Sequence, residues 1–377
     1  MTNNKQQTTN NSLLLGQLLN KVVVGEVLTD VEWQQLTDET LTPPQRAKSF
    51  DITPENVEER IEVQFHILQA VYSDILSLPS FSPKIDEDLA TIAQAKILSL
   101  LWTFWIPLAM QLSAKRKHLD RPLIQGILGG QGTGKTTLAA VLKLILAHLG
   151  YTTLSLSLDD LYKTYEERQR LRQQDPRLIW RGPPGTHDIE LGLQVLDQLR
   201  SPHQYQSILV PRFDKSAWSG GGDRTVPETV QGIDIVLFEG WFVGAQPINS
   251  AVFDTLTLAP LETDADRVFA RDMNEQLKDY LPLWERLDQL MILYPKDYRF
   301  SQTWRLQAEQ QMIATGKSGM NSSEVCEFVK YFWKSLHPQL FITPLLRNPN
   351  VVNLVIEINF DHSPGAIYRP KDRAVSF

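Results

Sequence analysis

A glycine-rich segment, GGQGTGKTT at residues 129–137, has the pattern of a phosphate-binding loop. It fits G-x-x-x-x-G-K-[ST], and it stands between an apolar run and a helical run, as this motif requires. Glycines let backbone N–H groups converge on phosphate oxygens, and the following helix N-terminus adds positive potential. We expect Lys135 to reach the β- and γ-phosphates and the Thr136 hydroxyl to bind Mg²⁺. The predicted nucleotide-binding residues are Gly129, Gly130, Gly132, Thr133, Gly134, Lys135, Thr136 and Thr137.

A second candidate for the metal site follows another apolar run. The segment IDIVLFEG places Glu239 at the end of a predicted strand. In phosphate-loop proteins an acid at such a position holds Mg²⁺ or its water. A surface glutamate in a turn before Gly240 is the structural alternative. Because the phosphate loop is present, we predict that Glu239 takes part in the metal site.

Two adjacent acids end a third predicted strand. The segment SLSLDDLYKT, residues 155–164, alternates serine and leucine and then carries Asp159 and Asp160. Open α/β sheets bind their ligands at the carboxyl ends of strands, so we predict Asp159 as the base that accepts the proton of an acceptor hydroxyl. Two roles are open for Asp160: a water-mediated contact with Mg²⁺, or a cap of the following helix.

Basic residues are concentrated in three later segments, RGPPGTHD (181–188), VPRFDKSAWSGGGDR (210–224) and YRFSQTWRLQAEQQM (298–312). A kinase for a small anionic acceptor needs such cations, and it needs a lid that excludes water. Structural alternatives stay open, namely a loop role for His187, a salt bridge between Asp214 and Arg224, and a solvated helix position for Arg305. The predicted substrate-binding residues are Arg181, His187, Arg212, Asp214, Lys215 and Arg224.

The composition limits the class of protein. The chain has 377 residues, 42% of them hydrophobic, which is enough for a substantial core. A net charge of −7 lacks the basic footprint of broad nucleic-acid binders, so no nucleic-acid partner is expected. The single cysteine, Cys326, excludes an internal disulfide and favours a reducing cytoplasm. The longest apolar stretch, about 97–112, is expected to be too short and interrupted to span a membrane.

The pattern of apolar residues predicts how these motifs are positioned. Residues 1–120 are expected to form a helical N-terminal region, except for a polar, disordered start (MTNNKQQTTNN). Residues 121–360 alternate strands with helices, which predicts an α/β, P-loop NTPase-type three-layer fold with a mostly parallel sheet and a lid around 296–320. Residues 361–377 are expected to be a polar tail. The strand candidates are 123–129, 152–158, 205–210, 233–238, 253–258, 289–294 and 352–358.

The motifs taken together resemble a known family. The order of GGQGTGKTT, LSLDDLYKT, RGPPGTHD, VPRFDKSAWSGGGDR, VLFEGWFVG and WRLQAE is similar to that of the D-glycerate 3-kinases, which belong to the P-loop kinase group of phosphoribulokinase, uridine kinase and pantothenate kinase. The resemblance covers residues 121–335. It implies ATP- and Mg²⁺-dependent phosphorylation of D-glycerate on its 3-hydroxyl, and a link to photorespiratory or serine-related carbon recovery. It also implies that Arg305 is a lid arginine that contacts the transferring phosphate, so the predicted catalytic residues are Lys135, Asp159 and Arg305.

Other functions of a nucleotide site remain as alternatives. One is a kinase for a different small acceptor, such as a nucleoside, pantothenate or a sugar phosphate. Another is a regulatory P-loop NTPase that hydrolyses its nucleotide to change a partner. A GTPase would normally carry an N/T-K-x-D motif, and the sequence has none. The expected partner is therefore the small molecule D-glycerate, without nucleic acid or membrane, and the sequence does not predict an oligomeric state.

Overall fold

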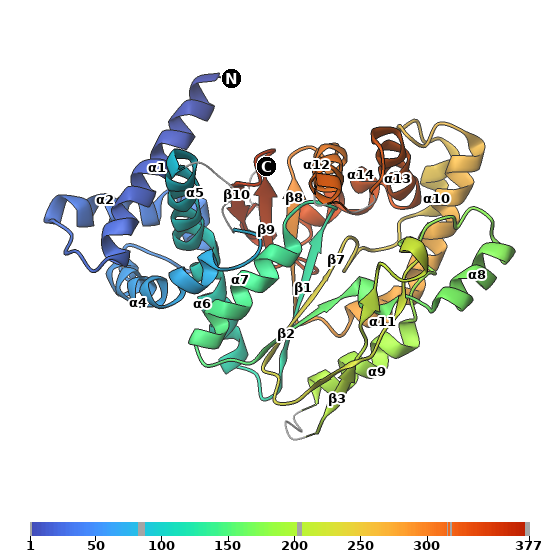
Figure 1. The fold of residues 1–377 in the computed structure, drawn as a ribbon, viewed down its shortest axis with the longest axis horizontal. Helices are drawn as coiled ribbons and strands as arrows, with labels where there is room; N and C mark the ends of the chain where they lie inside the picture. The colour runs from blue at the N-terminus through green and yellow to red at the C-terminus, as the bar shows by residue number, and fades with distance from the viewer. Residues whose placement is uncertain (1, 82–86, 202–205, 315, 317–318, 374–377) are drawn as a thin grey trace. The chain divides into compact units, whose positions relative to one another are not determined.

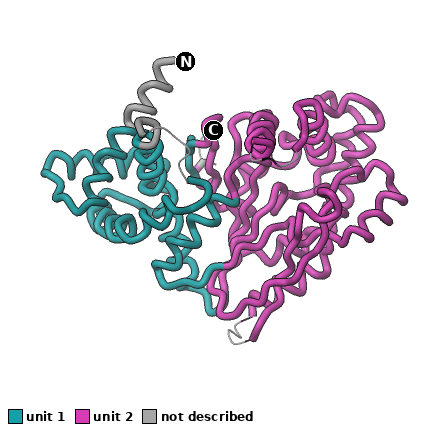
Figure 2. Tube along the Cα trace, viewed as in Figure 1, with its two compact units in different colours: residues 1–120, 136–153, 363–368 teal, residues 121–135, 154–362, 369–377 magenta. Residues whose placement is uncertain are grey.

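The computed structural model describes residues 2–81, 87–201, 206–314, 316 and 319–373. The chain forms two compact units (Figure 2). Unit 1 comprises Met1–Asp120, Thr136–Thr153 and Ser363–Tyr368, and unit 2 comprises Arg121–Lys135, Leu154–His362 and Arg369–Phe377. Each unit is described by itself below.

Unit 1 contains the N-terminal helices, one later helix and one strand. Apolar side chains of the helices form its core, where Leu36, Ile61 and Leu68 are fully buried. The indole of Trp102 is buried with them and donates a hydrogen bond to the Thr40 hydroxyl at 2.9 Å. The elements are α1 (Thr2–Val23), α2 (Asp30–Leu41), α3 (Pro44–Ser49), α4 (Val57–Leu76), α5 (Glu87–Leu100), a π-helical turn (Leu101–Trp105), α6 (Ile106–Lys117), α7 (Lys135–His148) and β10 (Pro364–Tyr368).

The apolar helix of unit 1 is longer than the sequence pattern predicted. It runs without a break over Thr91–Lys117, because the π-helical turn joins α5 to α6. By length and composition alone this helix could cross a membrane, so the expectation that the stretch is too short is wrong. The same test is passed by the core helices of water-soluble proteins, and 67% of its most apolar window is buried inside the protein.

Unit 2 is built on a mostly parallel sheet, with its strands in the order β9-β8-β1-β7-β2 (Figure 1). β1 (Leu123–Gly129) is buried along its whole length and pairs in parallel with β7 (Ile235–Gly240) and β8 (Gln289–Pro295). β8 also pairs in parallel with β9 (Leu354–Ile358). β2 (Thr153–Ser157) lies next to β7. A continuous apolar run such as β1 is typical of a strand that is covered on both faces.

The other elements of unit 2 surround this sheet. The helices are α8 (Tyr165–Gln174), α9 (Ile189–Arg200), α10 (Asp264–Gln276), α11 (Leu281–Trp284), α12 (Phe300–Ala314), α13 (Ser322–Ser335), α14 (Pro338–Phe341) and α15 (Pro370–Arg373). Short 3₁₀ turns cover Leu158–Leu161, Trp218–Gly220, Ser250–Asp254, Leu277–Tyr280 and Thr343–Arg347. Two small antiparallel sheets pair β3 (Ile208–Val210) with β6 (Glu228–Val230), and β4 (Phe213–Asp214) with β5 (Asp223–Arg224).

One predicted strand is wrong, and another forms a strand that lies outside the main sheet. The candidate at 205–210 contributes only β3, which lies in a separate two-stranded sheet and leaves Leu209 59% exposed. The candidate at 253–258 starts inside a 3₁₀ turn, whose N-cap Asn249 accepts a hydrogen bond from the backbone of Ala251. In the second of these places a capped turn forms where the apolar run predicted a strand.

Both ends of the chain contain elements that the sequence did not predict. The sequence predicted a disordered start, whereas the backbone from Thr2 is part of α1. The expected polar tail after residue 361 contains β10 and α15, and Ile367 and Tyr368 are only 2% and 1% exposed. These two apolar side chains stabilise the segment by burial. Residues 374–377 lie outside the described part of the chain.

Candidate active site

The phosphate loop lies between β1 and α7, and its glycines shape it. Gly132 and Gly134 have φ angles of +78° and +86°, which favour glycine because other residues adopt them only under strain. Gly132 also lies against Trp304, whose Cβ would be only 2.5 Å from a Cβ added at Gly132. The hydroxyl of Thr133 donates to the Gly130 carbonyl at 2.8 Å. The loop is therefore held in a curled form, with its shape set from within and by Trp304.

Lys135 is the first residue of α7, and its ammonium group lies over the loop. Nζ donates to the Gly130 carbonyl oxygen at 3.1 Å and lies 3.9 Å from Oε2 of Glu239. The side chains of Lys135 and Glu239 are only 14% and 13% exposed. Burial lowers the pKa of Lys135, and the nearby charges of Glu239 and Asp159 oppose this shift. Lys135 is thus a shielded cation that a phosphate oxygen can bind in place of a backbone carbonyl.

The two threonines after Lys135 lie in the first turn of α7. The side chain of Thr136 is exposed, as a metal ligand requires. The hydroxyl of Thr137 lies 3.3 Å from the hydroxyl of Ser80, in the N-terminal helical region. The sequence predicted Thr137 as a nucleotide-binding residue, and the structure gives its side chain this other hydrogen-bond partner.

The sheet register positions Glu239. Glu239 pairs with Ile127 in the ladder between β7 and β1, two residues before the end of β1 at Gly129. Gly129 in turn pairs with Leu293 of β8. The carboxyl ends of three neighbouring strands therefore meet at the phosphate loop, as in other open parallel sheets that bind ligands at this edge.

Asp160 caps the turn that follows β2. Its Oδ2 accepts a hydrogen bond from the backbone N–H of Ser157 at 3.0 Å, and the hydroxyl of Ser157 accepts one from the backbone of Asp159 at 3.2 Å. Nη1 of Arg212 donates to the same Oδ2 at 2.8 Å. Burial raises the pKa of Asp160, against the effect of these two donors. Of the two roles that the sequence left open, the structure supplies the contacts of a cap.

Asp159 points to a different partner. Its Oδ2 forms an ion pair with the ammonium of Lys215 at 2.6 Å. Burial acts to raise the pKa of Asp159, but the charge and hydrogen bond of Lys215, together with the Tyr162 hydroxyl, outweigh burial and hold this pKa below its usual value. Lys215 is 62% exposed, so it is a surface cation that reaches a half-buried carboxylate.

His187 is fully enclosed beside Asp159. Its ring stacks on Tyr162 with centroids 4.5 Å apart, and Nδ1 lies 2.7 Å from the Tyr280 hydroxyl. Burial lowers the pKa of His187 to about 3, against the opposing charge of Asp159, so the imidazole is neutral. Its buried Nε2 has no hydrogen-bond partner among the described residues. Tyr162 and Tyr280 are not among the residues that the sequence predicts for the site, because only the fold brings their rings to His187.

Three predicted substrate-binding arginines form hydrogen bonds with other residues of unit 2. Arg212 bridges Asp160 and Glu228. Arg224 donates to the Asp188 carboxylate at 2.7 Å. Arg181 donates to the carbonyl oxygen of Gly220 at 2.7 Å.

These contacts hold the loop of residues 210–224 in place. Nε of Arg224 also donates to the Tyr162 carbonyl oxygen at 3.0 Å. The carboxylate of Asp214 accepts hydrogen bonds from the backbone and the hydroxyl of Ser216, as in an Asx turn. The structure therefore gives Asp214 and the three arginines loop-shaping contacts, and it leaves Lys215 and His187 as the predicted residues that face Asp159.

The lid region includes α12, which packs on the phosphate loop through Trp304 rather than through Arg305. Trp304 is 3% exposed, donates to the Phe360 carbonyl at 2.9 Å and stacks on His362. Arg305 forms an ion pair with Glu309, one turn later in α12, and its guanidinium lies 5.2 Å from the Phe328 ring centroid. Its predicted contact with a transferring phosphate would require Arg305 to leave Glu309. Residues 315, 317 and 318 of the predicted lid lie outside the described part of the chain.

The fold and this site define a P-loop kinase. A parallel sheet carries a glycine-rich loop with Lys135, a strand-end acid at Glu239, and a second strand-end acid at Asp159 that can face an acceptor.

Comparisons with known proteins identify the family within this class. No family model matches the chain. The chain is 32% identical over 256 residues to the chloroplastic D-glycerate 3-kinase of Arabidopsis thaliana, a match that covers 64% of this chain but only 54% of that protein. It is also 32% identical over 232 residues to the uncharacterized kinase mug58 of Schizosaccharomyces pombe, which covers 59% of this chain and 82% of that one.

A solved structure gives the same result for the fold. The D-glycerate 3-kinase from Cryptococcus neoformans var. grubii is 29% identical, with a TM-score of 0.62 over 70% of this chain and 97% of that one. The chain therefore belongs to the family of P-loop kinases that includes the D-glycerate 3-kinases of plants and fungi.

Proposed function

We propose that this protein transfers the γ-phosphoryl group of ATP to the 3-hydroxyl of D-glycerate, giving 3-phosphoglycerate and ADP. The observation that carries the proposal is the ion pair between Asp159 and Lys215 beside the phosphate loop. This pair would supply a base for a hydroxyl and a cation for a carboxylate within one contact of each other, and glycerate carries both groups. The similarity to proteins named D-glycerate 3-kinase supports this choice of acceptor.

The proposal includes Mg²⁺, and two residues would hold it. Glu239 lies 3.9 Å from Lys135, beyond hydrogen-bond distance, so its carboxylate keeps lone pairs for a cation or for its water. Thr136 follows Lys135 in the chain and has an exposed hydroxyl. Carboxylate and hydroxyl oxygens are ligands that Mg²⁺ accepts, so these residues fit the ion. When bound, Mg²⁺ would neutralise charge on the phosphates.

Lys135 would bind the phosphate groups, and Asp159 would bind the acceptor hydroxyl. Lys135 would exchange its contact with the Gly130 carbonyl for phosphate oxygens, and it would stabilise the charge that develops on the transferring group. Asp159 would orient the 3-hydroxyl toward the phosphorus atom and accept its proton late in the transfer. A carboxylate with a low pKa is a weak base, so its main contribution is orientation.

Lys215 would recognise the carboxylate of the acceptor. The Lys215 ammonium has three donors on a flexible stem, so it can retain Asp159 and still bind the glycerate carboxylate. The neutral His187 is enclosed by Tyr162 and Tyr280, so its role would be to position the Tyr162 ring beside Asp159.

The proposal is tested by the dependence of ADP release on the acceptor. The purified full chain is assayed with Mg·ATP and, separately, D-glycerate, L-glycerate, glycerol, uridine, pantothenate or a sugar phosphate. We expect ADP release to depend on D-glycerate and to yield 3-phosphoglycerate. If ADP release is faster with another acceptor, that acceptor and not D-glycerate is the substrate. Equal ADP release without any acceptor would indicate a regulatory NTPase.

Lys215→Met is expected to raise KM for D-glycerate by about tenfold or more, because the substrate carboxylate loses its charged partner. The KM for ATP should change little. The matched control is Lys278→Met, which removes another exposed lysine whose ion-pair partner is Glu275 and not Asp159. An unchanged KM for D-glycerate in Lys215→Met would contradict the assigned role of Lys215.

The same variant has a distinct effect on the pH profile. Lys215 favours the ionised form of Asp159, so wild-type Asp159 stays ionised down to below its ordinary pKa of about 3.9. Without Lys215, burial is the dominant influence and raises the pKa of Asp159. The acid limb of kcat/KM should therefore move to higher pH in Lys215→Met and stay in place in Lys278→Met. This shift would not follow from a purely structural role of Lys215.

We also propose a cytoplasmic location and a role in recovering glycerate carbon, as in photorespiration. The single cysteine supports a reducing compartment, and the family resemblance supports the pathway. The acidic net charge of −7 supports a small-molecule partner over nucleic acid. Fractionation of cells that express the full chain would test the location.

A further inference from the structure

The loop of residues 210–224, which carries Lys215, contains a turn with unfavourable backbone angles. Trp218 and Ser219 have φ angles of +53° and +54°, in the left-handed region that residues other than glycine enter at a cost in free energy. Such a conformation persists only where contacts with the rest of the fold hold it. The turn begins three residues after Lys215, so the contacts that hold the turn limit the positions that Lys215 can take.

The first of these contacts come from Arg168 of α8. Its guanidinium group donates to three carbonyl oxygens, from Nε to Lys163 at 3.0 Å, from Nη1 to Gly221 at 2.8 Å and from Nη2 to Gly222. Lys163 lies in the segment that carries Asp159, whereas the two glycines lie in the loop. One planar group therefore joins the segment of the proposed base to the loop.

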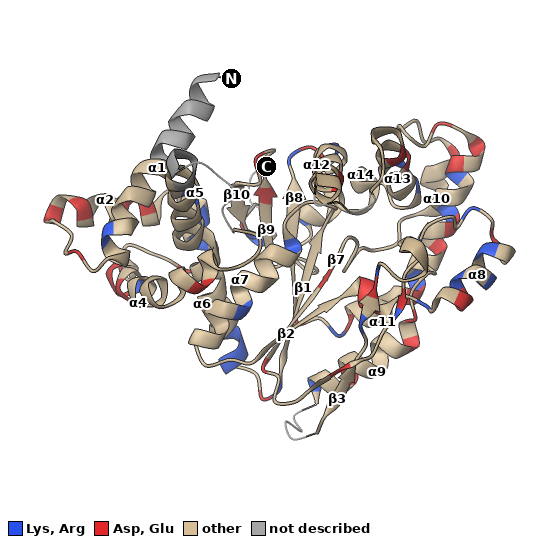
Figure 3. Cartoon of the chain, in the orientation of Figure 1, with Lys and Arg blue, Asp and Glu red and all other residues tan. Residues whose placement is uncertain are grey.

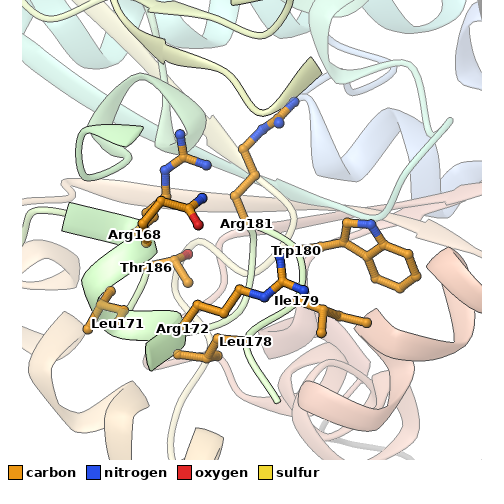
Figure 4. A pocket seen from close by; sticks show the side chains of 9 residues that line it. Arg168, Leu171, Arg172, Leu178, Ile179, Trp180, Arg181 and Thr186 are labelled. Carbon is orange, nitrogen blue, oxygen red and sulfur yellow. The ribbon is translucent and has the colours of Figure 1, made fainter. Parts of the chain in front are cut away.

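Arg181 holds the same turn from a second direction. It donates to the carbonyl oxygens of Gly220 at 2.7 Å and Gly221 at 3.1 Å. Both arginines line the small pocket in Figure 4, where their guanidinium ends lie above the other labelled side chains in the view. They meet at the Gly221 carbonyl, which accepts from both. Hydrogen bonds from charged donors are stronger than those from neutral donors, so these contacts can offset the strain of the turn.

Aromatic and polar contacts fix the turn to the start of α8. The Trp218 ring stacks on Tyr165, the first residue of α8, with centroids 4.9 Å apart. The indole of Trp218 donates to Oδ2 of Asp223 at 2.9 Å, and Oδ1 of Asp223 accepts the backbone N–H of Tyr165 at 2.9 Å. The indole is 63% exposed, but these partners give it a defined position.

The ring of Phe213 fixes the other side of Lys215. Phe213 lies two residues before Lys215, and its ring packs edge-on against Tyr162 with centroids 5.0 Å apart. The Arg168 guanidinium lies 5.3 Å from the same ring centroid. Gly222 approaches so closely that a Cβ added there would lie 2.4 Å from the Phe213 ring. The chain is thus held on both sides of Lys215, by Phe213 before it and by the turn after it.

We propose that Arg168 is a positioning residue of the acceptor site, which holds the strained turn and thereby places the Lys215 ammonium against Asp159. The Lys215 side chain is 62% exposed, yet its ammonium meets Asp159 at 2.6 Å. A lysine whose backbone is fixed loses less conformational entropy when it binds an anion, so a held turn favours binding of the acceptor. This inference rests on the proposed function, in which Lys215 binds the acceptor carboxylate.

The test is a double-mutant cycle with Arg168→Gln and Lys215→Met in the full chain, with KM for D-glycerate as the measurement. Arg168→Gln is expected to raise this KM by about threefold to tenfold and to leave KM for ATP near wild type, because only the placement of Lys215 is lost. In the Lys215→Met background, Arg168→Gln should raise KM by less than about twofold, since a residue that acts through Lys215 has no further effect without it.

Two further variants keep the cycle interpretable. Arg168→Lys retains a positive charge but lacks the planar fork that bonds three carbonyls, so we expect it to keep a Tm near wild type and still to raise KM for D-glycerate by at least about twofold. It completes the cycle if Arg168→Gln does not fold. The matched control is Arg170→Gln, because Arg170 is an exposed arginine of the same charged helix (Figure 3) and pairs with Glu166. Its KM should equal that of wild type.

The cycle distinguishes failure of this inference from failure of the proposed function. Equal KM values in Lys215→Met and in the double variant support the positioning role. If the effects of the two single variants multiply in the double variant, Arg168 acts independently of Lys215 and the inference is overturned. A raised KM in Lys215→Met with an unchanged KM in both Arg168 variants overturns the inference and leaves the proposed function intact. An unchanged KM in Lys215→Met overturns both.

Discussion

Lys135→Ala is expected to lower kcat/KM for ATP by at least about 10²-fold, the order of effect seen when one preorganised donor to a developing charge is removed. The side chain of Lys135 is only 14% exposed, and Lys135 is the first residue of α7. Its ammonium reaches the Gly130 carbonyl and approaches Glu239. A shielded cation of this kind is stronger toward phosphate than an exposed one, because water competes less.

The measurement is steady-state ADP release together with the Kd for a non-hydrolysable ATP analogue. Lys143→Ala is the control, because Lys143 is an exposed lysine on the same helix. We expect it to behave as wild type in both measurements. Normal ATP turnover in Lys135→Ala would contradict the nucleotide site itself, and not only the choice of acceptor.

The phosphate loop could be predicted from the sequence because its chemistry is local. Glycine positions, the lysine and the flanking strand and helix are adjacent in the chain, and the structure has β1 at Leu123–Gly129 as the sequence predicted. The parallel sheet was predictable for a similar reason, because continuous apolar runs such as β7 and β8 have few alternatives to burial. Local patterns fail at short apolar runs such as 253–258, where a capped turn competes with a strand.

The roles of the basic residues could not be predicted in the same way. Arg181, Arg212 and Arg224 have the composition of an anion site, but their partners are carbonyls and carboxylates far along the chain, such as Gly220, Glu228 and Asp188. Which basic side chain remains available to bind a substrate anion depends on the contacts that form in the folded loop. Long-range contacts of this kind leave no spacing signal in the sequence, whereas the adjacent pair of acids at 159–160 does.

Asp159→Asn is the second large effect that we expect, with kcat lowered by about 10²-fold, the lower end of the range for a positioned proton acceptor. The amide keeps the shape of the carboxylate, but it cannot take up the hydroxyl proton and it loses the ion pair with Lys215. Because Lys215 would then be free to bind the glycerate carboxylate alone, KM for D-glycerate should change much less than kcat.

The neighbouring acid provides a matched control, since Asp160→Asn removes one charge from the same turn. Asp160 caps the turn through Ser157 and pairs with Arg212, so its loss should lower Tm by a few degrees, about 1 kcal/mol, and leave kcat near wild type. The two variants therefore distinguish the catalytic role proposed for Asp159 from the structural role of Asp160. If kcat of Asp159→Asn stays within about threefold of wild type, a difference below about 1 kcal/mol, Asp159 is not the proton acceptor. If Asp160→Asn loses kcat as strongly as Asp159→Asn, the cap assigned to Asp160 is not its main role.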